Sequence, residues 1–301
     1  MKAVVLKAYG DVDQLSYEEV ERPQPQAGEV LVKIAAASVN PIDWKIRSGA
    51  MREIMRIPLP TVLGYDLAGE VVELGAGVTS FAIGQKVLAI ADHCYAEYAV
   101  VKAEVLAPMP EGLSFEQAAA LSLVSITGTQ LVESGIKPTS GQSVLLTGAL
   151  GGVGRSAAYA ATKLGAKVIV AVRSGQVAEA KLLGTSAVVS LEDDAGLANF
   201  SNLDGFADTV GGPVAAKLLK LLRPGGIYAT VVGPPNEVKD YDIRVEMVFS
   251  HPDASRLAEL AEDVVRGRLK LPVARVFKLS EVAEAQKLAQ SGAGGKVVLI
   301  P

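Results

Sequence analysis

A short apolar run that ends in a cluster of glycines constrains this chain most. Residues 144–147 are apolar or β-branched, residues 148–154 read Gly-Ala-Leu-Gly-Gly-Val-Gly, and a segment of small residues follows up to Gly165. This order predicts a buried strand, a tight turn and a helix of about 12 residues. The β-branched run at residues 167–172 predicts a second buried strand. Together these segments predict a βαβ unit.

The glycines have separate expected roles if this unit binds a dinucleotide. Gly151 lies where a Cβ would hold the backbone away from the pyrophosphate, and Gly154 lies where the first helical turn must press against the strand. Compared with the G-x-G-x-x-G fingerprint, Ala149 replaces the glycine that forms the turn, with Gly148 directly before it. The predicted cofactor-binding residues of this loop are Gly148, Ala149, Gly151, Gly152, Val153 and Gly154.

The residue after the second strand indicates which dinucleotide binds. An NAD site usually has Asp or Glu there, about 20 residues past the glycines, to hold the ribose 2′-hydroxyl. This chain has Arg173, followed by Ser174. A guanidinium binds a 2′-phosphate through charge-assisted hydrogen bonds, whereas a carboxylate repels it. We therefore expect NADP(H) as the cofactor; the alternative is an ordinary solvated arginine at a strand end.

Composition excludes several other classes of protein. The 301 residues are 50% hydrophobic, which is ample for one large or two ordinary domains. A net charge of −4 gives no electrostatic footprint for nucleic acid or an anionic membrane. One cysteine excludes an internal disulfide and fits a reducing compartment. Without a signal peptide or an 18-residue apolar run, the expected location is the cytoplasm.

The order of the predicted elements indicates two kinds of sheet. The N-terminal third contains β-rich segments without crossover helices, which favours antiparallel pairing in a barrel-like or strongly bent sheet. These segments are residues 2–6, 29–39, 67–74, 86–90 and 96–101. Ser114 and Gln117 have capping-box spacing and predict a helix start. From there strands and helices alternate, giving about six strands of a doubly wound parallel sheet. The last strand, residues 296–300, is expected to return to the N-terminal sheet.

Several motifs spread over nearly the whole chain resemble one family. They are Asn-Pro-Ile-Asp at 40–43 with Arg-Ser-Gly at 47–49, and residues 63–71, 95–98, 149–154, 208–212 and 295–299. In this order they resemble the medium-chain dehydrogenase/reductase superfamily, in its zinc-free quinone oxidoreductase (zeta-crystallin-like) branch. The resemblance implies an α/β fold in which a doubly wound Rossmann parallel sheet is inserted in a GroES-like, mostly antiparallel β catalytic domain. The expected boundaries are 1–115 and 256–301 for the GroES-like domain, and 116–255 for the Rossmann NADP(H)-binding domain.

Metal chemistry is limited by the donor residues. Zinc-dependent relatives need a Cys/His set, and often four clustered cysteines, whereas this chain has Cys94, His93 and His251 alone. We therefore predict no metal. Without a Lewis acid to stabilise an alkoxide, oxidation of simple alcohols is disfavoured, while an acceptor that delocalises its charge into a conjugated carbonyl needs less help.

The expected activity is hydride transfer from NADPH to a quinone or to the β-carbon of an α,β-unsaturated carbonyl. The resemblance places Asn40, Asp43 and Tyr65 in the substrate cleft, facing the nicotinamide. Asn40 or Tyr65 would donate to the substrate oxygen, and Asp43 would orient its loop or form a turn. Solvent could also protonate the enolate that hydride addition to the β-carbon produces.

The resemblance also implies cofactor contacts outside the glycine loop. Thr127 would lie beside the nicotinamide, unless it bonds its own helix backbone. Gly233, at the end of the fifth predicted strand, and Phe249, on the sixth, would line the same end, and Phe249 is alternatively core or dimer interface. Relatives suggest a homodimer.

Two other activities remain open. One is reduction of an aldehyde at its carbonyl, which needs a positioned acid that the sequence does not identify. The other is NADPH binding without turnover, in a redox sensor or a structural protein. The expected partner is a small quinone or enone substrate. No nucleic acid and no membrane is expected as a partner.

Overall fold

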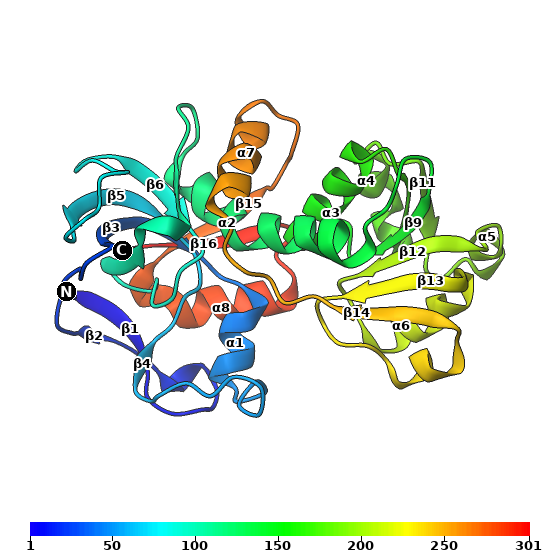
Figure 1. Cartoon of the computed structure of the whole chain (residues 1–301). Helices are drawn as coiled ribbons and strands as arrows, with labels where there is room; N and C mark the ends of the chain where they lie inside the picture. The colour runs from blue at the N-terminus through cyan, green and yellow to red at the C-terminus, as the bar shows by residue number, and fades with distance from the viewer. The chain divides into compact units, whose positions relative to one another are not determined.

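The computed structural model describes all 301 residues and divides into two compact units (Figure 1). Unit 1 contains Met1–Leu123 and Pro252–Pro301, and unit 2 contains Val124–His251. The boundaries therefore fall after residues 123 and 251, where the sequence analysis placed them after 115 and 255. The first differs because α2 (Phe115–Gln130) continues without a break through it and into a π-helical turn at Leu131–Ile136.

Unit 1 is built mostly of antiparallel strands, as predicted. A three-stranded sheet has the order β2-β1-β4. A larger sheet has the order β15-β16-β3-β5-β6-β8, with β7 also paired to β3, and only its β15–β16 pair is parallel. The strands are β1 (Lys2–Leu6), β2 (Leu15–Glu19), β3 (Glu29–Ser38), β4 (Thr61–Val62), β5 (Leu67–Leu74), β6 (Lys86–Ala89), β7 (Tyr98–Lys102), β8 (Leu106–Pro108), β15 (Val273–Lys278) and β16 (Lys296–Ile300).

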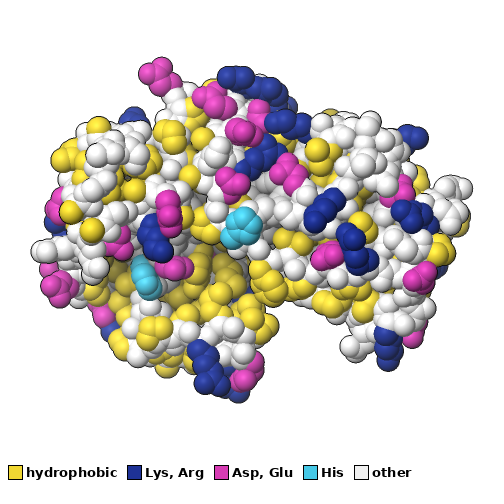
Figure 2. Space-filling view, in the orientation of Figure 1, with side chains coloured by type: hydrophobic (Ala, Val, Ile, Leu, Met, Phe, Trp, Pro, Cys, Tyr) yellow, Lys and Arg dark blue, Asp and Glu magenta, His cyan; other side chains and the backbone are white.

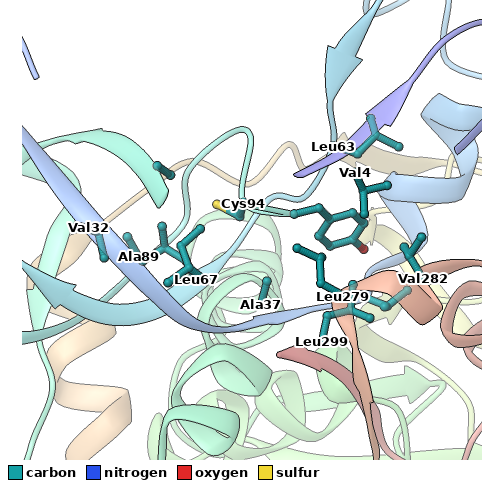
Figure 3. Close-up of a cluster of buried hydrophobic side chains, with 14 of the residues drawn as sticks. Val4, Val32, Ala37, Leu63, Leu67, Ala89, Cys94, Leu279, Val282 and Leu299 are labelled. Atoms are coloured by element: carbon teal, nitrogen blue, oxygen red, sulfur yellow. The ribbon is translucent and has the colours of Figure 1, made fainter. Parts of the chain in front are cut away.

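The C-terminal strand closes unit 1. β16 pairs with β3 at Val298↔Ser38 and Leu299↔Ala37, which confirms the predicted return of the last strand. In the core, Leu279, Val282 and Leu299 pack with residues from the other end of the chain, among them Val4 and Leu63 (Figure 3). Burying each such side chain stabilises the fold by about 1.5–3 kcal/mol, so unit 1 depends on both ends of the sequence.

Three further helices belong to unit 1. They are α1 (Pro41–Arg47), α7 (Ala254–Val265) and α8 (Val282–Ser291). α1, which the sequence analysis did not predict as a helix, begins at a capping box between Asn40 and Asp43, with Pro41 in the first turn. The predicted capping box of α2 is confirmed, because Ser114 and Gln117 exchange two hydrogen bonds of 3.2 Å.

Unit 2 contains a six-stranded sheet in the order β11-β10-β9-β12-β13-β14, with every pair parallel. Counted along this unit the order is 3-2-1-4-5-6, that of the doubly wound dinucleotide-binding fold, so the predicted fold class is confirmed. The order reverses between β9 and β12. The strands are β9 (Ser143–Thr147), β10 (Lys167–Val172), β11 (Ala187–Ser190), β12 (Leu203–Asp208), β13 (Leu222–Thr230) and β14 (Ile243–Met247).

Helices cover both faces of this sheet. Val144 and Leu146 of β9 pack into a core with α3 (Gly152–Lys163) and α4 (Val177–Lys181). Leu145 points the other way, into a core with α5 (Asp194–Ala198) and α6 (Gly212–Leu218). A strand buried on both faces must be apolar throughout, which explains the uninterrupted runs in the sequence. No helix of the chain is both long enough and apolar enough to span a membrane.

Candidate functional site

The glycine loop joins β9 to α3. Gly148 has φ +64°, so it makes the left-handed turn, while Ala149 beside it is buried. A Cβ on Gly154 would lie 2.1 Å from the carbonyl oxygen of Gly148, so the close approach of α3 to the loop requires a glycine there. A Cβ on Gly151 would come no closer than 3.4 Å to any atom of the protein. The chain's own packing therefore does not require Gly151, and an approaching dinucleotide gives a reason for it.

Two more glycines bring α2 against this loop. A Cβ on Gly128 would lie 2.3 Å from the carbonyl oxygen of Val153, and one on Gly152 would lie 2.8 Å from Val124 Cγ2. Thr127, half-buried beside Gly128, therefore lies on the part of α2 that contacts the start of α3. Its proximity to a nicotinamide stays a prediction.

Asp208 fixes the carboxyl ends of three strands where the strand order reverses. Its carboxylate accepts hydrogen bonds from Thr147 Oγ1 at 2.6 Å and Tyr228 Oη at 2.8 Å, and from two backbone N–H groups of the following turn. Burial, with the nearby Asp208 carboxylate, raises the pKa of the Tyr228 hydroxyl, which therefore remains a donor. In the sequence, Asp208 stands out only as part of the motif at residues 208–212. An acidic residue directly after the apolar residues Phe206 and Ala207 was the available signal in the sequence.

Arg173 and Ser174 lie directly after β10, as predicted. The Arg173 side chain is exposed, and its Nε is 3.4 Å from Gln176 Oε1. Ser174 donates from both its backbone N–H and its hydroxyl to the carboxylate of Glu192, at 2.8 Å each. Glu192 also accepts a hydrogen bond from Ser190 Oγ at 2.7 Å. The hydroxyls of Ser190 and Ser174, with the Ser174 N–H, lower the pKa of Glu192 to about 2. Ser190 and Glu192 were not predicted from the sequence.

Gly233 and Phe249 lie in loops beyond the last two strands of the sheet. β13 ends at Thr230 and Gly233 follows with φ +102°, in open space where a Cβ would have no atom of the protein within 4 Å. β14 ends at Met247, so Phe249 is not on the sixth strand as predicted. Its side chain is 64% exposed, which excludes the core alternative.

In unit 1, Asn40 is the centre of a buried polar cluster. Its amide Nδ2 donates to Asp66 Oδ2 at 2.7 Å, and its Oδ1 accepts from Lys296 Nζ at 2.6 Å. Asp66 also accepts two hydrogen bonds of 2.6 Å from Ser38. Because Asn40 is fully buried and both ends of its amide are engaged, it is arranged to position its neighbours.

Asp43 joins the same cluster from α1. One carboxylate oxygen, Oδ2, accepts from the Asn40 N–H and from Tyr95 Oη, both at 2.6 Å, while Oδ1 has no partner. Burial raises the pKa of Asp43 to about 7, against the lowering effect of the Tyr95 hydrogen bond. Burial also raises the pKa of Asp66 and lowers that of Lys296. Asp43 thus holds the start of α1 through the Asn40 N–H. Its expected place in a substrate cleft stays a prediction.

Tyr65 is only half-buried, unlike Asn40 and Asp43. Burial first, and then the negative charges of Asp92 and Asp43, raise the pKa of its hydroxyl. The phenol therefore stays protonated at neutral pH and is able to donate a hydrogen bond.

Cys94 and His93, whose side chains are of the kinds that bind metals, contact backbone carbonyl oxygens of the protein. Cys94 is buried, its Sγ donates to the carbonyl oxygen of Ala91 at 3.0 Å, and burial raises the pKa of its thiol. His93 Nδ1 is 2.9 Å from the carbonyl oxygen of Val62. No three His, Cys, Asp or Glu side chains lie together in a way that could hold a metal ion.

Two protein families match separate parts of this chain. Residues 26–111 match the Alcohol dehydrogenase GroES-like domain, and residues 164–299 match the Zinc-binding dehydrogenase family. The NADPH-dependent alkenal/one oxidoreductase of Arabidopsis thaliana is 32% identical over 100% of this chain and 80% of its own length. The 2-haloacrylate reductase of Burkholderia sp is 30% identical, covering 99% of this chain and 98% of that protein.

A solved structure gives the same result. The quinone oxidoreductase from Coxiella burnetii superposes with a TM-score of 0.89 at 30% identity, covering 100% of this chain and 99% of that one. The unit that interrupts the antiparallel unit has the doubly wound dinucleotide-binding fold with a glycine loop, and the matched relatives are oxidoreductases. The chain belongs to the medium-chain dehydrogenase/reductase superfamily, among its quinone oxidoreductase-like members.

Proposed function

We propose that this protein is an NADPH-dependent reductase of quinones or α,β-unsaturated carbonyl compounds that works without a metal. The observation that carries the cofactor choice is Arg173 with Ser174 at the end of β10, where a carboxylate would select NADH. The name of the Arabidopsis relative, which includes NADPH and alkenals, supports the same cofactor and substrate class. Bound NADPH would supply the hydride.

The residues of unit 1 would act on the substrate oxygen. Tyr65, half-exposed and with its pKa raised by burial, is the proposed donor to the oxygen that gains negative charge. Asn40 and Asp43 are proposed as positioning residues, because their buried hydrogen bonds hold the start of α1. This assignment chooses Tyr65 over Asn40, which the sequence alone left open.

Metal independence is proposed from the chemistry of the donor residues. A thiolate, not a thiol, binds zinc, and burial raises the pKa of Cys94. The two histidines of the chain, His93 and His251, supply too few further ligands. A conjugated acceptor spreads its developing charge, so a hydrogen-bond donor suffices in place of a Lewis acid.

A turnover assay tests this proposal. The protein is mixed with NADPH and a panel of 1,4-quinones and enals, and loss of the reduced nicotinamide absorbance is followed. We expect turnover with at least one acceptor class, unchanged by a chelator. Tight NADPH binding without oxidation by any acceptor would instead identify a redox sensor or a structural protein.

The partner proposals follow from the surface. The chain has a net charge of −4, and acidic and basic side chains are interspersed on the face shown in Figure 2, so a nucleic-acid partner is not proposed. A homodimer is proposed, because β14 is an edge strand of the unit 2 sheet and exposes Val245 and Met247. Phe249, which is exposed two residues beyond this strand, would extend the apolar surface.

A further inference from the structure

Glu192 occupies a set of hydrogen-bond donors that suits a larger anion. One carboxylate oxygen, Oε2, accepts from the Ser174 N–H, the Ser174 hydroxyl and the Ser190 hydroxyl, at 2.7–2.8 Å. The two hydroxyls are themselves 2.8 Å apart. Three donors that converge on one anionic oxygen form an anion cradle, which we call the serine cradle (Ser174 and Ser190).

The residue before Ser174 in the sequence is a cation. Arg173 directly precedes Ser174, and its exposed guanidinium makes only a long hydrogen bond, 3.4 Å from Nε to Gln176 Oε1. The guanidinium therefore remains available to a second anion, and it is not engaged by Glu192. A phosphate group has three terminal oxygens, which can accept hydrogen bonds from the serine donors and from the guanidinium together. The Glu192 carboxylate accepts from the serines alone.

We propose that Glu192 is an internal placeholder for the 2′-phosphate of NADPH: its carboxylate fills the serine cradle in the free protein and must leave when the phosphate binds. The inference rests on the proposed function, because it takes the Arg173 end of β10 as the site of the 2′-phosphate. It assigns two residues, Ser190 as a phosphate-binding residue and Glu192 as a residue that sets cofactor selectivity.

Charge explains why Glu192 must be displaced and not simply protonated. Its pKa is lowered to about 2, so it stays anionic at any working pH, and two anions in one cradle repel each other. NADH carries a hydroxyl in place of the phosphate and leaves the carboxylate undisturbed. Glu192 therefore weakens NADPH binding but not NADH binding. It reduces the preference for NADPH over NADH that Arg173 creates.

Isothermal titration calorimetry with 2′,5′-ADP and 5′-AMP tests this proposal without any turnover. The variants are Glu192→Ala, which empties the cradle, and Glu192→Gln, which removes only the charge. Glu237→Gln, an exposed carboxyl group elsewhere in unit 2, is the matched control. We expect Glu192→Ala to bind 2′,5′-ADP about tenfold more tightly than the wild-type protein, with a smaller gain for Glu192→Gln. The gain should shrink at high salt.

Binding of the second ligand, 5′-AMP, shows whether the rest of the nucleotide site is intact. Binding of 5′-AMP should change by less than about twofold in all variants, since it has no 2′-phosphate. Adding Ser190→Ala to Glu192→Ala should weaken 2′,5′-ADP binding about fivefold, because one donor is lost. Unchanged or weaker 2′,5′-ADP binding in Glu192→Ala would overturn the inference, as would weaker 5′-AMP binding, which would show that Glu192 holds the ribose hydroxyl.

The same titrations with Arg173→Ala separate an error in the placeholder from an error in the proposed cofactor. If Arg173→Ala weakens 2′,5′-ADP binding selectively while Glu192→Ala changes nothing, the placeholder is wrong and the NADPH proposal stands. If Arg173→Ala affects both ligands equally and neither binds more tightly than the other, the NADPH proposal fails, and the placeholder fails with it.

Discussion

Asp43 and Asp66 are two buried carboxyl groups that share one buried cation, Lys296. Asn40 connects them, since it donates its N–H to Asp43 and its amide to Asp66 and accepts a hydrogen bond from Lys296. One cation offsets at most one of the two negative charges, so burial favours a proton on the other group. Asp43, whose pKa is raised to about 7, is the group expected to hold it.

Replacing Asp43 should therefore change how stability depends on pH. Well below its ordinary pKa of 3.8, Asp43 is protonated in both the folded and the unfolded state. As pH rises toward 7 the unfolded state ionises first, so the wild-type protein loses stability. Asp43→Asn cannot ionise. Its unfolding free energy relative to wild type should rise by up to about 4 kcal/mol between pH 4 and pH 7.

Urea unfolding at several pH values measures this difference. Asp13→Asn, which changes an exposed carboxyl group of unit 1, is the control and should follow the wild-type curve. A difference between Asp43→Asn and wild type that does not vary with pH would show that Asp43 is ionised in the fold throughout this range.

Tyr65 is the residue on which the proposed chemistry in unit 1 depends. Tyr65→Phe should lower kcat for an enone or quinone about 10- to 100-fold, because a donor to the developing oxyanion is lost. The dissociation constant for NADPH should stay the same. Tyr17→Phe, at an exposed tyrosine of β2, is the control. Full activity of Tyr65→Phe would show that solvent supplies the proton.

At the scale of elements, the turn from β9 to α3 separates glycines needed for folding from those needed for binding. Gly154→Ala should lower the unfolding free energy by about 2 kcal/mol or more, because its Cβ would meet the Gly148 carbonyl oxygen. Gly151 has φ −78° and ψ 163°, which alanine adopts freely. Gly151→Ala should therefore fold normally and bind NADPH about tenfold more weakly.

Thermal unfolding and NADPH titration of both variants check this contrast. A Gly151→Ala protein that binds NADPH as tightly as wild type would show that no dinucleotide backbone approaches this residue. Equal destabilisation by both substitutions would show that the loop is packed more tightly than its geometry indicates.

The sequence predicted those elements whose pattern is local. β1, β5 and β16 have the predicted bounds. Each is a run of β-forming residues that is followed directly by a polar residue, Gly or Pro. It missed β2, which reads Leu-Ser-Tyr-Glu-Glu, and the two-residue β4, because both are strands through their pairing with β1. Tertiary contact decided these segments, and propensity did not.

The site divides in the same way. The glycine loop and Arg173 follow from spacing along the chain, so they were found from the sequence. The Glu192 contact with Ser174 joins the ends of β10 and β11, and Lys296 reaches Asn40 from the far end of the chain. Such contacts depend on strand order and register, which no single segment encodes.

At the scale of the whole molecule, the proposed homodimer depends on β14. Val245 and Met247 are 38% and 40% exposed on this edge strand. Sedimentation velocity should give a dimer for the wild-type protein and a monomer for Val245→Lys/Met247→Lys. Val265→Lys, at an exposed apolar residue of unit 1, should remain dimeric. A monomeric wild-type protein would contradict the proposal.

The proposed function depends above all on the cation after β10, which we propose makes this oxidoreductase NADPH-dependent. The most direct measurement is kcat/KM for NADPH and for NADH, with one enone or quinone, in the wild-type protein and in Arg173→Asp. We predict that NADPH is favoured at least about 100-fold in the wild-type protein, because the guanidinium binds the 2′-phosphate, and that Arg173→Asp loses most of this preference. Equal use of both cofactors by the wild-type protein, or equal losses for both in Arg173→Asp, would contradict it.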